Sequence, residues 1–121
     1  DNSRCATALI ATGLLGSDLD VPTGQDVARQ CSIKVLAQVR HALGDLQRIH
    51  RLTKITVLVA STSGLSEQHA VANGASSVFT DVLAERVRQA RSAIGVSGLL
   101  MQAPVEVEAI LAISWSWRQM T

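Results

Sequence analysis

The segment from Val105 to Ile113 alternates between two kinds of side chain, and this alternation constrains the fold more than any other feature. Its sequence is Val-Glu-Val-Glu-Ala-Ile-Leu-Ala-Ile. Successive side chains of a strand point to opposite faces, so Glu106 and Glu108 share one face. The other face is apolar and comprises Val105, Val107, Ala109, Leu111 and Ile113. We therefore predict a strand with one face in the core, whose two carboxylates face either water or a site.

A second short alternating run, from Arg91 to Val96, comes before this strand, and a connection containing Gly98 and Pro104 separates the two. The pattern predicts two strands and a loop, with Arg91 at a strand start and Glu106 or Glu108 on a neighbouring strand. A guanidinium matches a carboxylate bidentately, and a nearby carboxylate positions water or shuttles a proton. A plain structural Arg–Glu pair explains the same pattern equally well.

Two segments have helical periodicity. Residues 25–43 place apolar side chains three and four apart, which predicts a long amphipathic helix that Gly44 ends. Thr23 is a candidate cap, and Asp26 suits the positive end of the helix dipole. Residues 66–83 predict a second helix, which Asn73-Gly74 weakens in its middle. Its predicted apolar stripe comprises Val71, Ala75, Val78, Phe79 and Val82.

Two further strands are expected. Residues 52–59 alternate and are rich in β-branched side chains, which indicates a central strand with Thr53, Ile55, Val57 and Val59 on one face. Residues 8–12 resemble a short buried strand that ends at Gly13.

The order of elements predicts an α+β domain of two layers, with a mixed sheet and two helices on one of its faces. At 121 residues the chain is expected to form a single domain, with terminal extensions at 1–7 and 114–121. Only 17% of the residues are charged. We therefore expect a second subunit to cover the other sheet face, as in a homo-oligomer.

Composition argues against several classes of function. Eleven basic and ten acidic residues give a net charge of +1, and the aromatic residues are two Trp and one Phe, so nucleic acid is not an expected partner. The histidines and cysteines lack metal-ligand spacing, and buried Cys31 is expected to be structural. No phosphate loop, dinucleotide fingerprint or nucleophile elbow is present, so no cofactor is expected. No signal peptide or membrane-spanning run is found, which makes the cytoplasm the expected location.

The run Ala-Arg-Ser-Ala-Ile-Gly-Val at 90–96, followed by Leu99 and by Ala-Pro-Val-Glu-Val-Glu-Ala-Ile at 103–110, resembles the C-terminal signature of the RidA (YjgF-like) family, also called endoribonuclease L-PSP. Leu-Ile-Ala-Thr-Gly at 9–13 and Val-Ala-Asn-Gly-Ala-Ser at 71–76 resemble earlier family segments in the same order. The resemblance covers about residues 8–113 and implies a chorismate-mutase-like fold, a homotrimer and ligand clefts between subunits.

The resemblance further implies deamination of 2-imino acids, or their enamine tautomers, to 2-oxo acids and ammonia. Arg91 would bind the carboxylate of a small ligand, and Glu106 would hold or activate water. Gly13 would line the cleft, with Asn73 and Ser92 at its periphery. Two other functions stay open: a non-catalytic trimeric module that binds small molecules or regulates a partner, and an endoribonuclease, which the near-neutral charge and scarce aromatics disfavour.

Overall fold

The computed structural model describes residues 11–114, without the side chains of Arg88 and Gln89. Its main elements are α1 (Val21–Leu43), β1 (Ile49–Ala60), α2 (Gln68–Leu83), β2 (Val87–Val96) and β3 (Val105–Ile113). Short 3-10 turns, η2 (Leu46–Arg48), η3 (Ala84–Arg86) and η4 (Leu100–Gln102), precede β1, β2 and β3. The expected residues 8–10 of the first strand, and both tryptophans, lie outside the described part of the chain.

The helix α1 extends over 23 residues and has a defined cap at each end. Asp20 precedes it, and Asp20 Oδ1 accepts a hydrogen bond from the backbone N–H of Thr23 at 3.0 Å. Hydrogen bonds from Thr23 lower the pKa of the Asp20 carboxyl below its ordinary value. At the other end Gly44 adopts φ 85°, and its N–H donates to the carbonyl of Arg40.

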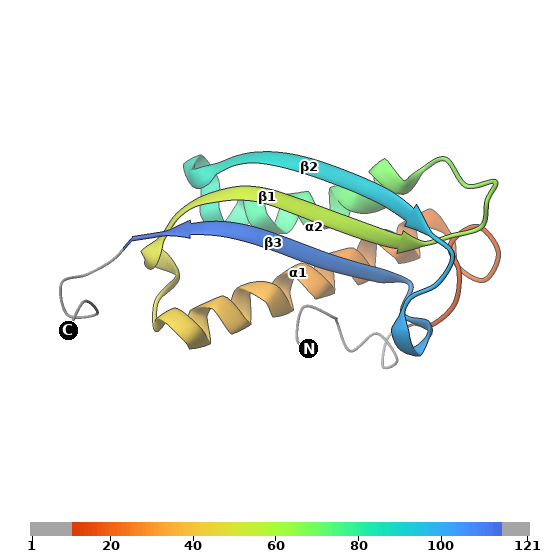
Figure 1. The fold of residues 1–121 in the computed structure, drawn as a ribbon, viewed down its shortest axis with the longest axis horizontal. Helices are drawn as coiled ribbons and strands as arrows, with labels where there is room; N and C mark the ends of the chain where they lie inside the picture. The colour runs from red at the N-terminus through yellow and green to blue at the C-terminus, as the bar shows by residue number, and fades with distance from the viewer. Residues whose placement is uncertain (1–10, 115–121) are drawn as a thin grey trace.

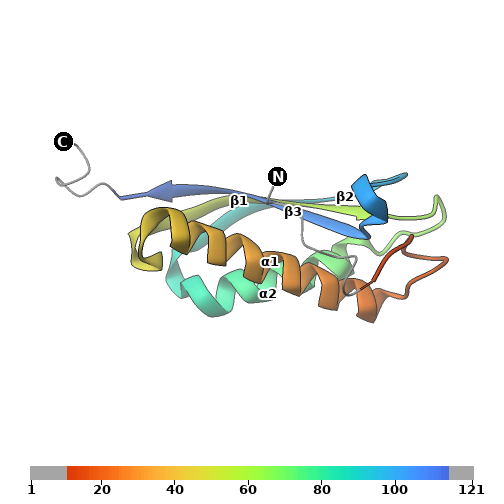
Figure 2. The same ribbon diagram turned by 90° about the horizontal axis from the view of Figure 1, so that it is seen from below.

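The three described strands form one mixed sheet in the order β2-β1-β3. β1 pairs parallel to β2 and antiparallel to β3, so β1 is central, as its β-branched composition predicted. Both helices pack on the same face of this sheet, which Figure 2 shows edge-on and Figure 1 shows face-on. The predicted α+β architecture, a mixed sheet with two helices on one face, is confirmed.

The core lies between the helices and one face of the sheet. Every second residue of β1 from Ile55 to Val59 is fully buried, as are Val105 and Val107 of β3. The largest fully buried side chain is that of Phe79 on α2. Cys31 of α1 is also buried in this cluster, as its apolar position predicted.

Gly74 explains how α2 packs against α1. A Cβ atom at Gly74 would overlap the backbone carbonyl of Gln25 on α1. Gln25 Nε2 donates to the carbonyl of Ala70 at 2.8 Å, which joins the two helices near the same point. The glycine that weakens α2 as an isolated helix therefore permits the close contact between the two helices.

Several local predictions were wrong. α1 begins at Val21 rather than Gln25, and its cap is Asp20 rather than Thr23. Ala11 and Thr12 are not in a strand. A register shift between Leu52 and Lys54 turns Leu52 into the core, so the predicted alternation fails there.

Two further corrections concern α2 and β2. Val82, predicted in the apolar stripe of α2, is 42% exposed, and Leu83 is buried in its place. Arg91 lies in the middle of β2 rather than at its start, because the strand begins at Val87.

Candidate functional site

Arg91 projects from β2 onto the helix-covered face of the sheet. It pairs in register with Ile55, whose buried side chain lies on that face. β2 is an edge strand of the described sheet, so the Arg91 side chain stays exposed beside α2 instead of entering the core. Its Nη1 donates to Asn73 Oδ1 at 2.8 Å and to Ser76 Oγ at 3.1 Å.

The partners of Arg91 on α2 are neutral. Asn73 and Ser76 accept hydrogen bonds without carrying a negative charge. A structural arginine buried in an ion pair has its charge compensated by a carboxylate, whereas these two acceptors leave the guanidinium charge uncompensated. The arrangement can therefore attract an anionic group.

Glu106 lies on the opposite face of the sheet from Arg91. Its neighbours Val105 and Val107 are fully buried beneath the helices, so the alternation of β3 turns the partly exposed Glu106 side chain away from them. Its partner in register on β1 is Leu58. Because β1 lies between β2 and β3, Arg91 and Glu106 are also separated by a strand. Within one chain, the structure does not bring this predicted pair together.

Gly13 lies at the end of the sheet where β3 begins. Its N–H donates to the carbonyl of Gln102 at 3.0 Å, and it lines a cavity of about 310 Å³ together with Ala60 and Ala103. Ala60 in turn donates to the carbonyl of Pro104, two residues before Glu106. Gly13 and Glu106 therefore belong to the same end of β3, away from the contact between Arg91 and α2.

Ser92 follows Arg91 on β2 and points to the other face. It pairs with Thr56 of β1, and its side chain is half-buried. The predicted site residues thus lie in three places. Arg91 and Asn73 are in contact beside α2, while Glu106 and Ser92 are on the open face and Gly13 is at the sheet's end.

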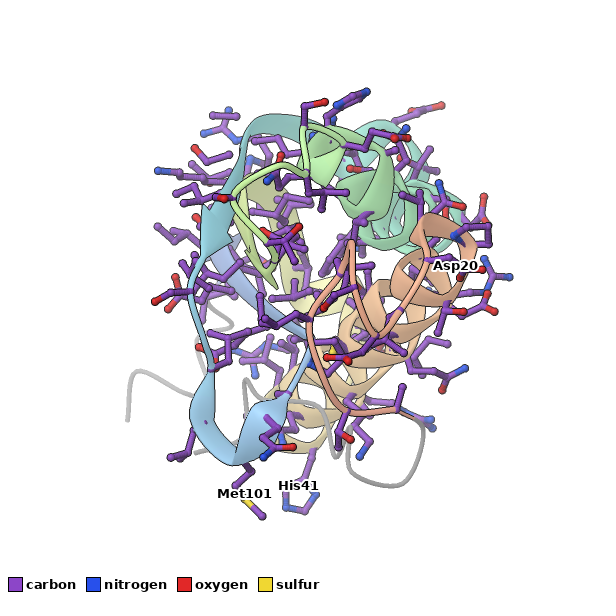
Figure 3. The ribbon with its side chains drawn as sticks, turned by 90° about the vertical axis from the view of Figure 1, so that its right-hand side faces the viewer. Asp20, His41 and Met101 are labelled. Carbon is purple, nitrogen blue, oxygen red and sulfur yellow. The ribbon has the colours of Figure 1, made fainter. Side chains whose placement is uncertain are left out.

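The open face of the sheet carries apolar side chains beside its polar ones. Ile94 of β2 is 45% exposed and Ile110 of β3 is 60% exposed. Beyond the sheet, the η4 turn presents Met101, which points away from the body of the molecule in Figure 3 and is 71% exposed. Exposed apolar groups on a sheet face are typical of an interaction surface.

Sequence reasoning missed Ser76, the second partner of Arg91 on α2. Its spacing of three from Asn73 places both on one side of α2, and this spacing was the available signal. Among residues 11–114, no cluster of three or more His, Cys, Asp or Glu side chains can hold a metal ion. No helix in this range is both long and apolar enough to cross a membrane.

Comparisons with known proteins identify relatives along most of the chain. The chain is 45% identical to protein TCP17 of Trypanosoma cruzi over 104 residues, which are 85% of this chain and 65% of TCP17. It is 46% identical to Atu1372 of Agrobacterium tumefaciens, a protein of unknown function, with a TM-score of 0.84 over 86% of this chain and 68% of that one. No protein-family model matches the chain.

A second solved structure connects the chain with a described fold. A candidate endoribonuclease from Shewanella oneidensis has a TM-score of 0.85 at 21% identity, over 92% of this chain and 74% of that one. The fold is therefore that of the YjgF-like, endoribonuclease L-PSP proteins, and the predicted RidA resemblance is confirmed at the level of the fold. The chain belongs to the same family as Atu1372, which shares this architecture.

Proposed function

We propose that this protein binds small 2-imino acids, or their enamine tautomers, and hydrolyses them to 2-oxo acids and ammonia. Arg91 anchors the substrate carboxylate, and Glu106 holds the attacking water. The site lies between two copies of the chain in a homotrimer, and no cofactor takes part. The observation that carries the proposal is the exposed guanidinium of Arg91, whose partners on α2 are the neutral oxygens of Asn73 and Ser76.

The placement of the two residues is the reason for a shared site. Arg91 and Glu106 lie on different strands and on opposite faces of the sheet, so neither can reach a ligand held by the other in one chain. A second copy that packs against the open face would bring its own Arg91 and Asn73 towards Glu106 and Gly13. The same packing would bury Ile94 and Ile110, whose exposure is otherwise costly in water.

The reaction needs few groups from the protein. Water adds to the carbon of the C=N bond, and a proton passes to the nitrogen, which gives a carbinolamine. As this intermediate collapses, its hydroxyl proton passes to the nitrogen, a C=O bond forms, and the C–N bond breaks to release ammonia. Glu106 accepts the proton of the attacking water and returns it to the departing nitrogen, while Arg91 holds the carboxylate beside the reacting carbon.

Activity is tested with an imine made in the assay by an amino-acid oxidase, with release of ammonia and 2-oxo acid as the readout. Arg91→Ala should reduce kcat/KM by about 100-fold or more, since it removes the bidentate anchor. Arg40→Ala removes an exposed arginine of α1 and is the matched control. Equal rates for wild type and Arg91→Ala would refute the proposal.

A mixing experiment tests the shared site. Arg91→Ala and Glu106→Gln should each be inactive, but subunits exchanged between them form sites that combine an intact Arg91 with an intact Glu106. About a quarter of the wild-type activity should return when equal amounts of the two variants exchange at random, because each site draws the two residues independently. A site contained in one chain would recover none.

The alternatives predict other results. A non-catalytic module would bind 2-oxobutanoate with thermal stabilisation but release no ammonia. An endoribonuclease would cleave RNA after extensive purification, and Arg91→Ala would abolish that cleavage. The Shewanella protein shares only the fold at 21% identity, so its description does not favour the ribonuclease for this chain.

A further inference from the structure

The hydroxyl of Ser76 contacts the same guanidinium nitrogen as the amide of Asn73. Arg91 Nη1 donates to Asn73 Oδ1 at 2.8 Å and to Ser76 Oγ at 3.1 Å. We propose that Ser76 is a positioning residue, which together with Asn73 fixes the Arg91 guanidinium so that its Nε and Nη2 edge binds the ligand carboxylate. The inference rests on the proposed function, in which Arg91 is the carboxylate anchor.

The first argument is the distribution of donors on Arg91. Nη1 carries two hydrogens, and Asn73 and Ser76 take one each. Within residues 11–114, leaving aside the side chains of Arg88 and Gln89, no acceptor contacts Nε or Nη2. These two nitrogens present parallel N–H bonds in the fork that matches both oxygens of a carboxylate. The occupied end therefore selects which edge of the guanidinium is left for a ligand.

The second argument is the rigidity of the acceptors. Asn73 and Ser76 are separated by three positions on α2, so one face of a continuous helix presents both oxygens. α2 is itself held against α1 at Gly74, where a side chain would not fit. An exposed arginine normally loses side-chain entropy when it binds a ligand, and a guanidinium already held at one end loses less.

The third argument concerns lysine at the same position. An ammonium has three donors on a single nitrogen, so Asn73 and Ser76 would leave one donor for a ligand and no fork for its two oxygens. Arg91→Lys should therefore bind carboxylates poorly although its charge is kept. A site that required only positive charge would tolerate this exchange.

The positioning is tested first without any ligand, by NMR of the arginine Nε–H groups in the full chain. The Arg91 signal is identified by its loss in Arg91→Lys. Ser76→Ala should make the Arg91 side chain measurably more mobile on the nanosecond timescale. Ser77→Ala is the matched control, because the Ser77 hydroxyl donates to the carbonyl of Gly74 and does not contact Arg91. Equal mobility of Arg91 in the Ser76→Ala and Ser77→Ala variants would overturn the inference.

The second measurement uses acetate and 2-oxobutanoate as probes. Ser76→Ala should raise the Kd of both, and the KM for imine, by about three- to tenfold with kcat nearly unchanged, the size expected for the loss of one ordinary intramolecular hydrogen bond. Ser76→Thr, which retains the oxygen, should restore binding, and Ser77→Ala should leave it unchanged. An unchanged Kd in Ser76→Ala would refute the positioning role.

The two proposals fail in different ways. If the wild type binds acetate at Arg91 in a Ser76-dependent manner but releases no ammonia, the deaminase proposal is wrong and the positioning role stands. If deamination depends on Arg91 but Ser76→Ala changes neither the Arg91 signal nor KM, the positioning role alone is wrong.

Discussion

The two faces of the sheet are made from the same strands and have opposite properties. On the helix-covered face, Ile55, Val57 and Val107 are fully buried. The open face carries Glu106 together with Ile94 and Ile110, which are 45% and 60% exposed. The covered face accounts for the stability of a single chain. The open face has the mixture of carboxylate and apolar side chains that suits an interface with a site in it.

Two arginines, Arg86 and Arg91, differ in a comparable way, in what their guanidinium groups contact. Arg86 donates to the backbone carbonyls of Leu83, Leu46 and Ile49, so its guanidinium ties the turns before β1 and β2 together. Among the described residues, the partners of Arg91 are two side chains of α2, both contacted by Nη1. Arg86 is thus occupied by the fold, whereas Arg91 is the arginine that we propose binds another molecule.

Ile55→Ala should have the largest effect on stability. It removes a fully buried side chain at the centre of the covered face and should lower the free energy of unfolding by about 2–5 kcal/mol. Ile33→Ala is the matched control, since Ile33 on α1 is 46% exposed. Urea denaturation measures both. Equal costs would mean that burial in the structure does not distinguish the two isoleucines in solution.

Gly74→Ala should come next. The added Cβ would overlap the carbonyl of Gln25, so α1 and α2 must separate locally, at a net cost of about 1–3 kcal/mol despite the better helix propensity of alanine. At Gly64, by contrast, a Cβ would meet nothing within 4 Å. Gly64→Ala should therefore leave the urea midpoint nearly unchanged. A stabilised Gly74→Ala would show that the helix crossing has room to spare.

Ile110→Lys tests whether the open face is an interface. The substitution should change the stability of the isolated chain by about 0.5 kcal/mol or less, because Ile110 is mostly exposed there. If the protein forms the proposed trimer, the substitution should nevertheless shift it to single chains in sedimentation, because a lysine would be buried at the interface. Ile33→Lys on the helical layer should keep the trimer. An intact trimer with Ile110→Lys would exclude the open face as the assembly surface.

The fold was largely predictable because its signals are local. The periodicity of residues 25–43 and the alternation of Val105–Ile113 each specify an element and its buried face. What sequence did not reveal depends on contacts between segments. Asp20 and Thr23 are both good caps, and the choice between them needs the path of the chain before α1. The register shift between Leu52 and Lys54 likewise arises only when β1 pairs with its neighbours.

For the candidate site, the sequence and its family resemblance suggest members but not their geometry. Alternation within one strand places Glu106 and Val107 on different faces of the sheet. It does not say on which of these faces a residue of another strand lies. The opposite placement of Arg91 follows from its register with Ile55. The spacing of three places Ser76 on the same side of α2 as Asn73, but the contact of Ser76 with Arg91 also depends on how α2 lies across β2, which the sequence does not show.

Asp20→Asn should have the smallest effect, and its value lies in the pH dependence. The pKa of Asp20 is lowered in the folded chain from its ordinary value of 3.8. The charged cap therefore stabilises α1 when the pH is above 3.8, and this contribution to stability is lost as the pH falls through the lowered pKa. Asparagine keeps an acceptor for the N–H of Thr23 but does not titrate. Thermal unfolding between pH 2 and pH 7 should therefore show a slightly smaller acid-induced loss of Tm for Asp20→Asn than for wild type. Parallel curves would mean that the Asp20 charge adds nothing beyond its hydrogen bond. In that case the cap of α1, unlike the anchor proposed at Arg91, works through its geometry alone.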